Sequence, residues 1–254
     1  MKTKISWIVF ILSLVTIIPV KIYSSINSLN WERTPMFAII VAILLLMCGV
    51  PLYMAKDLPE LPQVRKSFLL GIISCLTAVA FLWGAVACVT DIEAYDRHPL
   101  ILSILCLLSA VTFIFMSISF FTCKNMFKNG QILIFFPVLW SGMLMILFLS
   151  LSDNNIDPYN VLLKACMLMF LLYQSQIFVT STDRNTTRRI FMFGMPTILS
   201  LIMYNVPLVV SLVKNNSLSF YSTTVATCGI ETLICLYILC LLFECQSQIN
   251  SKKS

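Results

Sequence analysis

Long apolar stretches separated by short polar segments run along the whole chain. Eight of them have about the twenty residues that an α-helix needs to cross the hydrocarbon core of a bilayer. They cover residues 5–22, 37–55, 68–90, 99–121, 131–151, 159–180, 190–212 and 222–243. Membrane-spanning β-strands would instead alternate over about ten residues. We therefore expect an all-α, polytopic transmembrane helix bundle of about eight spans.

The polar segments between these stretches carry entry signals for helices but have no room for a second domain. Thr34-Pro35, His98-Pro99 and Asp157-Pro158 each place a proline near the first position of a helix, where its missing N–H costs nothing. We expect residues 1–254 to form one integral membrane domain. The first apolar run is longer than the ~7–15 residues of a signal-peptide core, so it predicts an uncleaved span.

The positions of Lys and Arg predict the orientation of the bundle. With the N-terminus inside, twelve of the seventeen lie on inside segments, four lie on outside segments, and Lys164 falls within a span. The inside residues are Lys2, Lys4, Lys56, Arg65, Lys66, Lys124, Lys128, Arg184, Arg188, Arg189, Lys252 and Lys253. Cytoplasmic loops carry the excess of positive charge in membrane proteins. Both termini are therefore predicted to be cytoplasmic.

Composition agrees with a chain whose main partner is the lipid bilayer. Hydrophobic residues make up 59% of the sequence and charged residues 11%, far from the proportions of soluble domains. The ten cysteines lie mostly within apolar runs, which favours reduced packing residues over disulfides. The net charge of +6 is not carried by any basic soluble module, so we expect no nucleic-acid partner.

The third span has small residues at every fourth position. Ala80, Gly84 and Cys88 share one helical face, and such faces let two membrane helices approach closely. The spacing predicts a helix-packing surface.

Two charged residues lie within predicted spans, where a charge is costly and marks a candidate functional site. Lys164 lies about five residues into the sixth span and Glu231 about nine residues into the eighth. Both spans enter from the same side, and at about 1.5 Å per residue the two depths differ by roughly 6 Å. A lysine side chain can bridge that difference.

Polar side chains follow one face of each of the last three spans. They are Asn160, Lys164 and Gln174 on the sixth, Tyr204 with the neighbouring Asn205 on the seventh, and Thr224, Cys228 and Glu231 on the eighth. One of two open interpretations is a small polar cavity, open to the outside, that binds a charged ligand or relays a proton. The predicted ligand-binding residues are Lys164, Glu231, Asn160, Gln174, Tyr204 and Asn205. The alternative is a structural ion pair in which the Lys164 ammonium extends toward the outer interface.

No pattern of catalytic or metal-binding residues is present. His98 is the sole histidine, and it stands before Pro99 where helix entry accounts for it. The H-E-x-x-H, G-x-S-x-G and phosphate-loop spacings are absent. We therefore expect no enzyme activity, no cofactor and no metal site.

These features favour a permease-like transport subunit, acting alone or with a separate cytoplasmic ATPase or other protein subunit. The alternative is a non-catalytic membrane sensor or assembly partner that docks cytoplasmic proteins through its short basic loops. In composition and layout the chain is similar to small multi-span proteins of Gram-positive bacteria. That similarity implies the plasma membrane, the cytoplasmic membrane of a bacterium, as its location.

Overall fold

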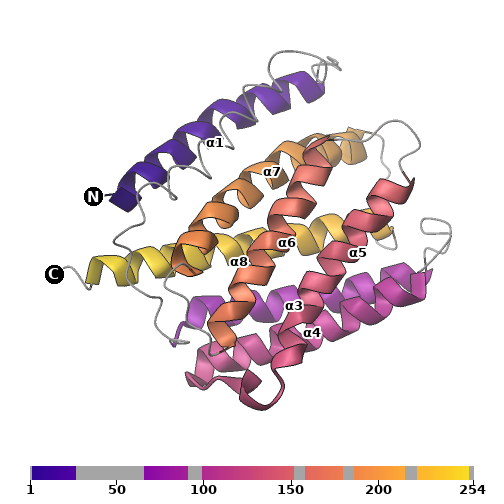
Figure 1. Ribbon diagram of the computed structural model, residues 1–254. Coiled ribbons are helices and arrows are strands. Elements are labelled where there is room, and N and C mark those ends of the chain that lie inside the picture. Colours follow the sequence, from indigo (N-terminus) through magenta and orange to yellow (C-terminus); the bar gives the residue numbers. More distant parts are fainter. Residues whose placement is uncertain are drawn as a thin grey trace.

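The computed structural model describes residues 2–26, 66–90, 99–151, 158–179, 186–214 and 222–251, and every element in these ranges is helical (Figure 1). The elements are α1 (Lys2–Ile26), α3 (Phe68–Thr90), α4 (Pro99–Thr122), the short 3-10 helices η3 (Met126–Asn129) and η4 (Gln131–Phe135), α5 (Phe136–Leu151), α6 (Pro158–Phe178), α7 (Thr186–Lys214) and α8 (Thr223–Ser251). The predicted all-α class is confirmed for this part of the chain.

Six of the described helical segments are long and apolar enough to cross a membrane. They correspond to the predicted third to eighth spans, with η4 and α5 together forming the fifth. The first predicted span coincides with α1, whose apolar part covers Ser6–Pro19. The second, 37–55, lies outside the described residues. The chain is a multi-pass membrane protein; the total of eight spans and the cytoplasmic termini stay predictions.

The end of α8 differs from the apolar pattern in position, and the start of the fifth span differs from it in helix type, each for a local reason. Helix α8 continues to Ser251, about two turns beyond the predicted end at 243. Its last residues include Glu244, Gln246 and Gln248, which favour helix in water, so the end of the apolar run does not end the helix. The fifth span starts as a 3-10 turn from Gln131, and α5 begins next to Pro137. Pro137 therefore stands in the first turn of α5, where its missing N–H is tolerated.

The six span-length segments form a closed ring. Each of α3 to α8 packs against the next one along the chain, and α8 returns to pack against α3. Helix α1 lies outside this ring and packs against α7 (Figure 1). The interior of the ring is therefore lined by all six segments, and residues of α6 and α8 can meet across it.

Successive helices run in opposite directions, so their ends gather at two ends of the bundle (Figure 1). The amide of Ser67 at the start of α3 donates to Phe120 O at the end of α4, and the Asn125 side chain donates to Phe178 O at the end of α6. The exposed Lys66, Lys124 and Lys128 also lie here. We call this the basic end. Helix α8 ends, and helices α1 and α7 begin, at the same end.

The small-residue face predicted on the third span is a packing surface between α3 and α8. A Cβ atom placed on Gly84 would lie 2.5 Å from Ile230 Cδ1, and one placed on Gly229 of α8 would lie 2.8 Å from the Trp83 ring. Each glycine thus makes room for a large side chain of the opposite helix. Ala80 and Cys88, one turn on either side of Gly84, are buried, which confirms the predicted packing face.

Candidate functional site

An ion pair crosses the interior of the ring near the end opposite the basic end. Lys164 Nζ on α6 contacts Glu231 Oε1 on α8. The exposed fractions of the two residues are 4% and 0%, so both charges lie inside the protein. The helical faces and depths in the sequence therefore predicted this contact correctly.

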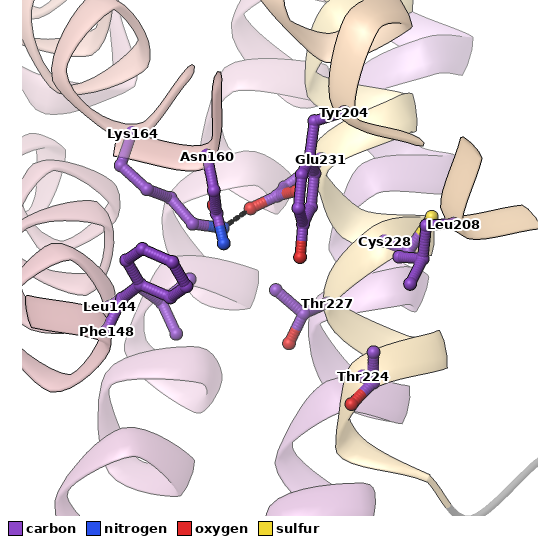
Figure 2. A pocket seen from close by; sticks show the side chains of 10 residues that line it. All are labelled: Leu144, Phe148, Asn160, Lys164, Tyr204, Leu208, Thr224, Thr227, Cys228 and Glu231. Carbon is purple, nitrogen blue, oxygen red and sulfur yellow. Dashed lines mark ion pairs between the residues drawn. The ribbon is translucent and has the colours of Figure 1, made fainter. Parts of the chain in front are cut away.

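A cavity of about 300 Å³ lies beside the pair, between α5, α6, α7 and α8. Its polar wall contains Lys164, Glu231, Asn160, Tyr204, Thr224, Thr227 and Cys228. Its apolar wall contains Leu144 and Phe148 of α5 and Leu208 of α7. Figure 2 shows the Lys164 and Asn160 side chains of α6 directed toward the carboxylate of Glu231, and the side chain of Tyr204 on α7 also lines this pocket. Thr224, in the first turn of α8, is exposed, so the cavity extends toward the end of the helix. We call this end of the bundle the cavity end.

Two oxygen atoms in the cavity wall have no hydrogen-bond partner among the described residues. They are Glu231 Oε2 and Asn160 Oδ1. Both residues are more than nine-tenths buried, and both line the cavity. An unpaired buried acceptor costs about 1–3 kcal/mol. The site is thus charged, confined and able to accept two more hydrogen bonds.

The structure brings together four of the six predicted site residues: Asn160, Lys164, Tyr204 and Glu231. Their role in binding a ligand stays a prediction. The other two residues lie elsewhere. Gln174 is about 15 Å from Lys164 along α6, at 1.5 Å per residue, and Asn205 donates through Nδ2 to Thr232 Oγ1 of α8 at 3.3 Å. Neither Gln174 nor Asn205 lines the cavity.

Gln174 belongs to a second contact between α6 and α8, nearer the basic end. Its Nε2 donates to the Tyr237 hydroxyl at 3.0 Å. Around Tyr237 lies an aromatic layer made of Tyr237, Phe113, Phe120, Phe178 and Phe127. Phe127 belongs to η3, is fully buried, and has its ring centroid 5.2 Å from that of Phe178. This layer fills the ring interior between the cavity and the basic end.

Part of the cavity wall has weak signals or none in the amino-acid pattern. Thr224 and Cys228 share the predicted polar face of the eighth span with Glu231, and both line the cavity. Phe148 and Leu144 are apolar residues in an apolar span, so nothing in the sequence sets them apart from lipid-facing neighbours. Their position depends on how α5 is rotated in the ring, which is a tertiary property.

No metal site accompanies the cavity within the described ranges, where no group of three or more His, Cys, Asp or Glu side chains is placed to hold an ion. Comparison of the chain with protein-family models, with curated proteins and with solved structures finds no match.

Proposed function

We propose that the protein binds a small solute in the cavity beside Lys164 and Glu231, and that it is a permease-like subunit of the cytoplasmic membrane of a bacterium. The observation that carries the proposal is the pair of unpartnered acceptors, Glu231 Oε2 and Asn160 Oδ1, in the wall of a cavity inside the bundle. The cavity wall supplies groups that can bind a solute, and we propose no enzyme activity.

In a purely structural ion pair, we would expect protein donors to bind both oxygens of the carboxylate. Burying two charges costs several kcal/mol per ion, and the cost is recovered where further hydrogen bonds satisfy the remaining lone pairs. Here the second oxygen of Glu231 has no donor among the described residues, and Glu231 lines the cavity. Charged and polar residues inside membrane proteins characteristically face such cavities and mark the paths of substrates or ions.

The arrangement along the ring axis supports transport. The cavity lies toward one end of the bundle, and the aromatic layer that contains Phe127 and Tyr237 fills the interior toward the other. Transporters hold their solute within the membrane and open to one side at a time. This conformation corresponds to access from the cavity end, and movement of the aromatic layer would give access to the basic end.

The experiment that tests solute binding is a thermal-stability screen of the purified protein in phosphatidylcholine nanodiscs. The probes are amino acids, sugars, nucleosides, organic acids, amines and inorganic ions. We expect at least one class to raise the Tm of the wild type, because a ligand that binds only the folded state stabilises it. The same ligand should leave the Tm of Glu231→Gln unchanged. Wild-type Tm values that no class raises would contradict the proposal.

The alternative function, a sensor or assembly partner, is favoured by the basic end. Lys66, Lys124 and Lys128 are exposed there, and the two arginines at the start of α7 are partly exposed. Such a surface could dock a cytoplasmic ATPase of a transport complex or an unrelated cytoplasmic protein. The two functions differ in whether the bound solute crosses the membrane. If the protein is a permease, a ligand from the screen should enter proteoliposomes that contain it, together with its ATPase where one co-purifies. Binding without flux would support the sensor.

A further inference from the structure

The charges of the cavity restrict the charge of its ligand. Lys164 and Glu231 carry one positive and one negative charge, and together they are neutral. A ligand with a single charge would leave one charge unbalanced in a buried site, which is strongly unfavourable. A neutral ligand without charges could not replace the ion pair. A ligand that carries both charges can bind each member of the pair and keep the site neutral.

The unpartnered atoms specify which group the ligand directs toward Glu231. Glu231 Oε2 and Asn160 Oδ1 are both acceptors, so the missing partner is a hydrogen-bond donor. A primary ammonium has three N–H donors and a positive charge, so it has enough donors for both oxygens. The anionic group of the ligand would then bind the Lys164 ammonium.

The size and walls of the cavity restrict the rest of the ligand. At roughly 30 Å³ for each water-sized group, a cavity of about 300 Å³ accommodates roughly ten heavy atoms. Leu144, Phe148 and Leu208 form a wall without hydrogen-bonding groups. Such a wall favours an apolar substituent, because covering apolar surface stabilises the complex by roughly 25 cal/mol per Å².

We infer that the cavity binds a small zwitterion with a primary ammonium, an anionic group and an apolar substituent. The ammonium lies between Glu231 and Asn160, and the anion contacts Lys164. This inference rests on the proposed solute-binding function. Free amino acids with apolar side chains have this chemistry, and the headgroup and first acyl carbons of phosphatidylethanolamine share it.

The test uses the full-length protein in phosphatidylcholine nanodiscs, since the choline ammonium has no N–H donor. Binding of glycine, L-leucine and L-phenylalanine is measured by calorimetry and by the shift in Tm. L-Leucinamide and 4-methylpentanoate retain the leucine side chain but carry only the positive or only the negative charge. We expect leucine or phenylalanine to bind, glycine to bind more weakly, and each singly charged analogue to bind at least about 100-fold more weakly than leucine.

Variants locate the binding in the cavity. Asn160→Leu keeps the approximate shape of the side chain and removes one acceptor for the ammonium, so we expect about a tenfold loss of affinity. Ser109→Ala is the matched control, because it removes another buried oxygen without a partner among the described residues, on α4 and away from the cavity. Its affinity for the zwitterion should equal that of the wild type.

A second set of nanodiscs, with phosphatidylethanolamine replacing part of the phosphatidylcholine, distinguishes the two sources of the ligand. If no free amino acid binds but phosphatidylethanolamine raises the Tm of the wild type more than that of Asn160→Leu, the zwitterion is a lipid headgroup. Equal binding of leucine and either singly charged analogue would overturn the inference and leave the binding site in place. The inference would also be overturned if no zwitterion binds while another class in the broad screen raises the Tm of the wild type and not of Glu231→Gln. If no class raises the Tm of the wild type, the proposed function fails as well.

Discussion

Neutralising either member of the Lys164–Glu231 pair leaves the other as a single charge inside the helix ring. With exposed fractions of 4% and 0%, neither residue can turn its charge into bulk water without moving the helices. Removing one partner of a buried pair costs about 3–5 kcal/mol of unfolding free energy. Because the pair borders a polar cavity, which gives the remaining charge some hydration, we expect about 3 kcal/mol for Lys164→Met and for Glu231→Gln.

The double variant Lys164→Met/Glu231→Gln should be far less destabilised than the two single variants together. It removes both charges, and replacing a buried pair with neutral groups is often neutral or stabilising. We expect its stability to lie within about 1 kcal/mol of the wild type, so the coupling between the two positions is about 5 kcal/mol. Glu244→Gln, lower on α8 and partly exposed, is the control and should change stability by less than about 0.5 kcal/mol.

The assay is equilibrium unfolding of the purified variants in mixed micelles with increasing dodecyl sulfate, followed by tryptophan fluorescence. Single-variant losses below about 1 kcal/mol would show that the two charges are hydrated and not paired in the interior. A double variant whose loss equals the sum of the single losses would show that the two residues do not interact. Either result would refute the reasoning from burial and charge.

Three further predictions concern the packing around the site, each measured by the same unfolding assay. Gly229→Ala should cost about 1–3 kcal/mol, since its Cβ would meet the Trp83 ring at 2.8 Å; an equal cost in a Trp83→Ala background would contradict this cause. Phe127→Ala should cost about 3–5 kcal/mol, because the ring is fully buried in the aromatic layer; a cost below about 1 kcal/mol would place the ring outside the core. Tyr237→Phe removes the hydroxyl that accepts from Gln174 at 3.0 Å and should cost about 0.5–1.5 kcal/mol; a gain in stability would show that this bond is not formed.

The helices could be predicted from the sequence because lipid allows few alternatives. A run of about twenty apolar residues has to form a helix across the bilayer, so α3 and α4 match their predicted spans to within one residue. The closure of the ring, with α8 against α3, could not be read from the pattern. It depends on the fit of Gly84 and Gly229 with large side chains of the facing helix, which becomes apparent only in three dimensions.

The site could be predicted where depth and helical face both pointed to it. The depths of Lys164 and Glu231 differ by roughly 6 Å, which a lysine side chain can bridge. Both residues line one cavity with Asn160 and Tyr204, which lie on the predicted polar faces of their helices. Gln174 lies on the same face of α6 as Lys164 but almost three turns deeper. The helical face alone does not show that a buried apolar segment, which includes Met167, separates the two residues.

The proposed function requires that solutes reach the cavity beside Glu231 and Lys164 from outside. Two native cysteines of α8 test it most directly: Cys228 lines the cavity, and Cys235, two turns deeper on the same helix, is buried and does not. Intact cells carrying the protein are treated with a membrane-impermeant thiol reagent, and modification of each cysteine is measured by mass spectrometry. We expect the reagent to modify Cys228 and not Cys235. If Cys228 is as unreactive as Cys235 from outside, the cavity is closed to solutes on that side and the proposed function is contradicted.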